Sequence, residues 1–189
     1  MIRTALAAAA IGLAISTPVL ADELGDTLKA ALSSYEAGDL SRTNEDLTYA
    51  MQLLNQRRAD ALQKFLPEAL DGWELSKSKG SNNGAGMAMF GGGLTANAVY
   101  RRDRERIEVQ IIANSPMIAS MAMIFNNPAA IGAQGKITRI GREKVLIKND
   151  GEMQSLVDNR ILVQVSGKAP AEAMEAYFRK IDLNGLKDF

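Results

Sequence analysis

The side chains most often used for acid–base and nucleophilic chemistry are missing from this sequence, which contains no histidine and no cysteine. Their absence excludes a Ser-His-Asp triad, a Cys-His pair and a zinc site built from histidine and cysteine. No disulfide bond can form, so the fold must be held together by its core. Acid–base catalysis would have to use carboxylates, lysine, tyrosine or backbone groups.

Two weaker catalytic patterns are present. Ser76 and Lys79 have the Ser-x-x-Lys spacing of serine acyl-enzymes, but they lie in a strand-to-loop segment without the partner motifs that this chemistry needs. Carboxylates occur in pairs on segments that we expect to be solvated. The sequence therefore predicts a protein that is not an enzyme and has no catalytic residue, and a carboxylate-based enzyme is the least favoured alternative. The carboxylate pairs are Asp22 with Glu23, Glu45 with Asp46, and Glu105 with Glu108.

Methionine is the remaining residue type with metal-binding chemistry, and the chain has nine methionines. Thioethers suit Cu(I), but a site without histidine or cysteine would be weak, and methionine more often fills cores. We therefore predict no metal and no other cofactor. The methionines and their neighbours are instead candidates for contact with a partner or an apolar ligand. The candidate residues are Met87, Met89, Phe90, Met117, Met121 and Phe125.

Several of these candidates belong to a strand-to-helix unit, residues 106–125. Its first residues alternate between apolar and polar side chains, which is typical of a half-buried strand. Ser115 and Pro116 then supply a helix start, and residues 117–125 contain one polar side chain. A helix this apolar must be covered, and we expect Tyr177 and Phe178 of a closing helix, with Leu54 and Phe65 of an earlier helix, to cover it.

Residues 1–21 have the pattern of a signal peptide: a basic start, a short apolar run and the small residue Ala21 before two acids. We predict cleavage after Ala21 and a periplasmic location. Removing 21 of 189 residues leaves 168, with 21 basic and 22 acidic residues. This near-neutral balance argues against a nucleic-acid partner. No further apolar run is long enough to cross a membrane, so no integral membrane segment is expected after cleavage.

Residues 22–66 are predicted to form a helical hairpin. Leu24, Leu28, Leu32 and Tyr35 recur at helical spacing before Gly38 interrupts. A second helix is expected to start near Thr43 or Asn44 and to end before Pro67. The segment resembles a tetratricopeptide-type hairpin over about one repeat. The alternative is an ordinary two-helix hairpin packed on the next domain.

Residues 67–189 are predicted to form one α+β domain. It contains a glycine-rich loop at 79–97, in which Met87, Met89 and Phe90 could form an apolar flap or fold back onto the domain. A β-hairpin and the apolar helix follow, then a small-residue loop at 129–135, four strands and a closing helix after Pro170. The predicted fold class is α+β: an N-terminal helical hairpin, then an antiparallel sheet of about six to seven strands with two packing helices.

The final part of the chain, residues 140–183, has a strand after a glycine, a hairpin, a strand ending in glycine and a closing helix. This order resembles small extracytoplasmic α+β domains of the PsbP-like and anti-sigma-associated kind. The resemblance implies a fold, and a role in binding or scaffolding. It carries over no functional residue.

Together these observations predict an exported, non-enzymatic binding or scaffold protein that contacts a protein partner or an apolar ligand. The second interpretation is an envelope factor with peripheral membrane contact. It would touch lipid through the Met87–Phe90 loop and the apolar helix.

Overall fold

The computed structural model describes residues 22–76 and 93–189, and the statements below concern these residues. It divides the chain into two compact units, residues 1–50 and 51–189, so the division falls inside a helix. We describe each unit by itself. The predicted contact residues Met87, Met89 and Phe90, and the predicted signal peptide, lie outside the described residues.

The first unit contains the predicted helical hairpin. Helix α1 (Glu23–Glu36) is followed by a turn at Gly38, whose φ of 78° suits glycine. Helix α2 (Leu40–Gln63) then begins three or four residues before the predicted start. The Asp39 carboxylate accepts a hydrogen bond from the Arg42 N–H at 3.0 Å and so caps this earlier turn.

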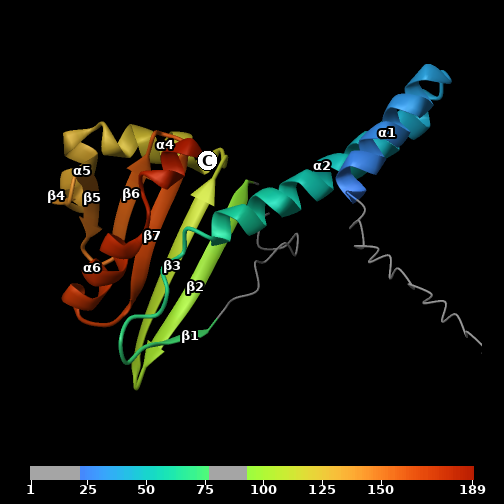
Figure 1. Cartoon of the computed structure of the whole chain (residues 1–189). Helices are drawn as coiled ribbons and strands as arrows, with labels where there is room; N and C mark the ends of the chain where they lie inside the picture. The colour runs from blue at the N-terminus through green and yellow to red at the C-terminus, as the bar shows by residue number, and fades with distance from the viewer. Residues whose placement is uncertain (1–21, 77–92) are drawn as a thin grey trace, which may run out of the picture. The chain divides into compact units, whose positions relative to one another are not determined.

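The second unit is built on one antiparallel seven-stranded sheet, and the chain therefore has the predicted α+β fold (Figure 1). The first three strands and the last four each run as a meander, and β3 and β7 join the two halves at the centre. In spatial order the strands are β1 (Glu74–Ser76), β2 (Leu94–Arg102), β3 (Glu105–Ala113), β7 (Ile161–Lys168), β6 (Met153–Val157), β5 (Glu143–Lys148) and β4 (Gly135–Ile140).

The two faces of this sheet differ in composition. One face, which we call the α6 face, packs against helix α6 (Ala171–Lys180) and the end of α2 in a large apolar cluster. Here Tyr177 lies between two aromatic rings, with centroids 5.5 Å from Trp73 and 4.2 Å from Tyr100. Ala59 and Leu62 of α2 belong to the same cluster, which explains why the latter half of α2 belongs to this unit.

Two tyrosine hydroxyls attach the segment after α2 to this core. The Tyr100 hydroxyl donates to the Pro67 carbonyl oxygen at 2.5 Å, and the Tyr177 hydroxyl accepts from the Leu70 N–H at 3.2 Å. Burial raises the pKa of both phenols, and for Tyr100 the neighbouring Tyr177 raises it further.

The opposite face, which we call the α4 face, is covered at one end by helix α4 (Met117–Phe125), as predicted from its apolar sequence. The prediction of a small-residue loop at 129–135 is wrong, because another helix, α5 (Pro128–Gln134), follows α4 there. The Asn127 side chain accepts hydrogen bonds from the Ala129 and Ala130 N–H groups and caps it. This cap, followed by proline, outweighs the low helix propensity of Gly132.

The predicted cover for α4 is also wrong. Ile118 packs against Ile112 and Leu162 of the α4 face, with Met117 and Met121 beside them. Tyr177, Phe178 and Phe65 belong to the cluster on the α6 face, and Leu54 is exposed. The reason is that the connection from β3 to β4 crosses the sheet on the side away from α6.

The sheet ends at two unlike edges. Strand β1 is three residues long, whereas β4 has six and carries exposed Lys136 and Arg139. The chain finishes with a 3-10 turn, η1 (Gly185–Asp188), which buries Leu186 in the α6-face core.

Candidate functional site

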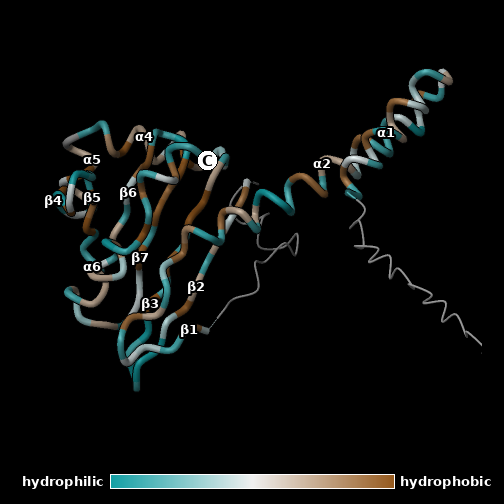
Figure 2. The backbone as a smooth tube through the Cα atoms, viewed as in Figure 1, coloured by the Kyte–Doolittle hydropathy of each residue, from teal (hydrophilic) through white to brown (hydrophobic). Residues whose placement is uncertain are grey.

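The hairpin exposes an unusual amount of large apolar surface. Among residues 22–50, Ala31 and Ala50 are the buried ones. Figure 2 shows hydrophobic residues recurring along both helices, between polar ones. Five large side chains form what we call the hairpin surface: Leu28 (48% exposed), Leu32 (58%), Tyr35 (62%), Leu40 (67%) and Leu47 (46%).

Helix geometry places these five side chains on one side of the hairpin. The buried Ala31 and Ala50 mark the line along which the two helices touch. Successive residues of a helix are rotated by about 100°, so the exposed side chains lie roughly 40–100° from the alanine of their own helix, in the same rotational direction when each helix is viewed from its N-terminus. The hydrogen bonds from Tyr49 to Glu23 and from Ser34 to Asp46 show that the helices are antiparallel, and in antiparallel helices this shared direction places both sets of side chains on one side of the hairpin.

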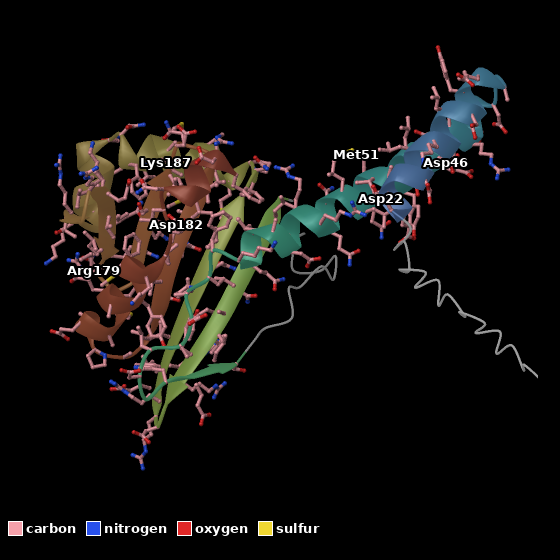
Figure 3. The ribbon with its side chains drawn as sticks, viewed as in Figure 1. Asp22, Asp46, Met51, Arg179, Asp182 and Lys187 are labelled. Atoms are coloured by element: carbon pink, nitrogen blue, oxygen red, sulfur yellow. The ribbon has the colours of Figure 1, made fainter. Side chains whose placement is uncertain are left out.

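Polar contacts hold the opposite side together. The Tyr49 hydroxyl donates to Glu23 Oε1 at 2.6 Å, and the Ser34 hydroxyl donates to Asp46 Oδ2 at 3.2 Å (Figure 3 labels Asp46). The hydrogen bond to Glu23, and the charge of Glu23, raise the pKa of the Tyr49 phenol. These contacts fix the pairing of the helices and leave the apolar side open.

The hairpin is also strongly acidic. Residues 22–50 contain seven acidic residues against Lys29 and Arg42, a net charge of −5. Such a charge favours partners that carry positive charge around an apolar stripe, and it repels anionic surfaces.

The sequence-predicted contact residues of α4 are only partly available for binding. Met117 and Met121 pack against the small cluster of Ile112, Ile118 and Leu162, and Phe125 is half-buried. Met123, which was not among the predicted contact residues, is 70% exposed. The structure thus gives α4 one packed side and one exposed methionine.

A charged and amide cluster lies on the α4 face of the sheet. Glu152 Oε1 accepts from the side-chain amides of Gln154 (2.7 Å) and Gln164 (3.1 Å), while Glu152 Oε2 accepts from Lys148 Nζ at 3.0 Å. Hydrogen bonding to Glu152 raises the pKa of Lys148 against the opposing effect of burial. Gln154 is 4% exposed, and its Oε1 has no hydrogen-bond partner among the described residues. These side-chain hydrogen bonds link β5, β6 and β7.

The predicted carboxylate pairs do not assemble into a site. Glu105 bonds to Arg102 and Glu108 to Arg106, while Glu23 and Asp46 serve the hairpin. In the described part of the chain no three acidic residues gather where they could hold a metal ion. Ser76 is exposed in β1, and Lys79 lies outside the described residues.

Comparison with known proteins finds no matching family model, no similar curated protein and no similar solved structure. The resemblances to tetratricopeptide hairpins and to PsbP-like domains therefore stay predictions. No helix in residues 22–76 and 93–189 is both long and apolar enough to cross a membrane. The hairpin surface was not among the predicted sites, although its signal, a leucine stripe beside a small-residue helix contact, is visible in the sequence.

Proposed function

We propose that this chain is an exported, non-enzymatic binding protein of the periplasm that holds a partner protein on its hairpin surface. The observation that carries the proposal is the group of five large apolar side chains on one side of α1 and α2. Soluble proteins rarely leave such a group uncovered, and clustered apolar surface usually marks an interaction site. The signal-peptide pattern of residues 1–21 supports the location.

The partner that best fits this surface is an amphipathic helix with basic flanks. Two antiparallel helices with a shared apolar side form a groove for a third helix, which would contribute residues at i, i+3, i+4 and i+7. The net charge of −5 on residues 22–50 would attract lysine or arginine on either side of that stripe.

A second copy of the chain fits less well. Its hairpin carries the same charge of −5, so pairing two hairpins would bring like charges together. In residues 51–76 and 93–189 the exposed large hydrophobics are Met51, Leu54 and Met123, a smaller set than the hairpin surface offers. Met51 and Met123 are also unbranched and flexible, so they favour no single complementary shape.

The proposal can be tested with two labelled designed peptides that share a leucine stripe and differ in having lysine or glutamate at every flanking position. Fluorescence anisotropy would measure their binding to the full mature chain. We expect the lysine peptide to bind more tightly, and its affinity to fall as salt is added. The double variant Leu32→Ser, Leu47→Ser should lose this binding, whereas Met123→Ser, which removes an exposed apolar side chain elsewhere, should keep it.

Equal binding of both peptides, or binding that survives in the double variant, would reject the hairpin surface as the docking site. Size-exclusion chromatography with light scattering adds a separate check. A dimer that dissociates in the double variant would make a second copy the occupant and would overturn the basic-helix proposal.

A further inference from the structure

Three positively charged residues lie side by side on the α4 face, at the end of the sheet far from α4. Arg101 of β2 is paired with Arg106 of β3, and Arg106 with Lys168 of β7. Directly opposed residues on neighbouring antiparallel strands bring their Cβ atoms to about 4.5–5.5 Å, at which like charges destabilise the pairing. Nothing in a sheet's own packing requires three cations in one row.

The row borders a concavity of about 720 Å³. The turn that joins β2 to β3 contributes to its lining, and Figure 1 shows this turn at one end of the sheet. Arg104 of that turn and the Ser166 hydroxyl also line it. The turn lies at one end of the sheet, while α4 follows the opposite end of β3. The concavity is therefore separate from the small core under α4.

Ion pairs neutralise part of this charge. Glu105 is held by Arg102 at 2.8 Å, and Glu108 is held by Arg106 at 2.7 Å. Arg101, Arg104 and Lys168 are exposed and take part in no ion pair within the described residues. Two acids at this end of the sheet are uncompensated: Asp103 of the turn, and Glu74 of β1, which is paired directly opposite Arg101. The net charge is therefore about +1.

The backbone is shaped to keep the three strands close here. Gly167, between Ser166 and Lys168, has a φ of 151°, and a Cβ atom at this position would overlap the carbonyl oxygen of Arg106. A glycine that allows this approach preserves the register that places Lys168 opposite Arg106. The cation row is therefore a consequence of close strand pairing and not of a loose surface loop.

We propose that the concavity bordered by Arg101, Arg106 and Lys168 binds a phosphate group. A guanidinium offers paired N–H donors that match two phosphate oxygens, and lysine adds a point charge. A phosphate anion complements this positive charge and relieves the repulsion along the row. The phosphate could belong to a small soluble phosphate compound or to a lipid headgroup. The site is independent of the hairpin surface.

The experiment uses the full mature chain and two probes: inorganic phosphate, followed by calorimetry, and vesicles of phosphatidylglycerol compared with phosphatidylcholine, followed by co-sedimentation. The test variant is Arg101→Gln with Lys168→Gln. Arg139→Gln on the exposed edge strand β4 removes a comparable surface cation from a strand that does not line the concavity and serves as the control.

We expect the wild-type chain to bind one of the two probes saturably. Each cation removed should weaken the affinity by about tenfold or more, because a hydrogen bond to a charged group contributes at least that factor. The affinity of the control variant should be unchanged. Phosphate alone would indicate a soluble ligand, and selective sedimentation with phosphatidylglycerol would indicate a headgroup. Thermal melting in phosphate-free buffer gives a second readout. There the double variant should melt close to the wild-type temperature, because it loses both the repulsion along the row and the attraction between Arg101 and Glu74.

Binding that is equally weakened by Arg139→Gln would show a general charge effect and would overturn the proposal. So would the failure of both probes to bind, or a double variant that melts well below wild type. Each of these outcomes leaves the hairpin proposal untouched, because Arg101 and Lys168 lie outside residues 22–50.

Discussion

The two units of this chain use apolar residues in opposite ways. In the sheet unit, one side-chain face of β2, β3 and β7 lies in the α6-face core, where Tyr100, Ile107 and Phe178 are almost wholly buried. In the hairpin unit, leucines of similar size lie exposed, and two alanines form the buried contact. Similar side chains therefore stabilise the fold in one unit and remain available for binding in the other. Four substitutions, ordered by the size of the expected effect, test this difference.

The largest effect should come from Phe178→Ala in α6. Phe178 is 1% exposed within the α6-face core, so truncation leaves a cavity that the sheet can close only partly. We expect a loss of about 3–5 kcal/mol in the free energy of unfolding, measured by urea denaturation. A loss below about 1 kcal/mol would mean that this core is loosely packed and that the contrast between the units is weaker than described.

Ile118→Ala in α4 should have an intermediate effect. Ile118 is buried, but its cluster on the α4 face contains two further buried residues, Ile112 and Leu162. A small and partly open cluster can relax around a truncation, so we expect a loss of about 2 kcal/mol. Phe125→Ala, at a half-buried position of the same helix, should cost less than Ile118→Ala in parallel urea melts. The reverse order would show that Phe125, and not Ile118, attaches α4 to the sheet.

Tyr100→Phe should cost about 1 kcal/mol at neutral pH, because it removes the hydrogen bond to the Pro67 carbonyl oxygen. The same variant should be less sensitive to alkali. The pKa of Tyr100 is raised in the folded chain, so the neutral phenol stabilises the fold below about pH 10 and this contribution is lost as the pH rises further. Melting curves between neutral pH and about pH 11 would measure both effects. Tyr35→Phe at an exposed position is the control, and an identical alkaline loss in both variants would contradict the assignment to Tyr100.

Leu32→Ala on the hairpin surface should have the smallest effect on stability, within about 0.5 kcal/mol, because the side chain is already in contact with water. Circular dichroism during urea denaturation would measure it. A loss near 2 kcal/mol would indicate that something already covers Leu32 and that the hairpin surface is not free to bind.

Much of the fold followed from local patterns. The alternation in β2 and β3, the Ser115-Pro116 helix start and the hairpin turns gave the elements and their order. The residues that cover α4 could not be predicted in this way. Alternating side chains show that a strand has two faces, but they do not show over which face the connection to the next strand passes. Helix α5 was missed because Gly132 and Gly135 favour a loop, although the alanines between them and Pro128 favour a helix, and the Asn127 cap decided between the two.

The candidate sites were harder to predict than the fold. The leucines of α1 and α2 were found, but periodicity alone does not separate a buried stripe from an exposed one. The cation row could not be found from sequence distance. Arg101 and Arg106 pair within the β2–β3 hairpin, but Lys168 joins them only through the pairing of β3 with β7. That pairing joins strands separated by the whole α4–β6 segment.

The edge strand β4 has a consequence for the chain at high concentration. Its outer backbone groups could template the strand of another molecule, which is how exposed sheet edges begin to aggregate. Lys136 and Arg139 project from this strand, so two copies that approach edge to edge bring four cations together before any hydrogen bond can form. The resulting repulsion should keep the protein dispersed in a crowded compartment, and neutralising both residues should lower the concentration at which it precipitates.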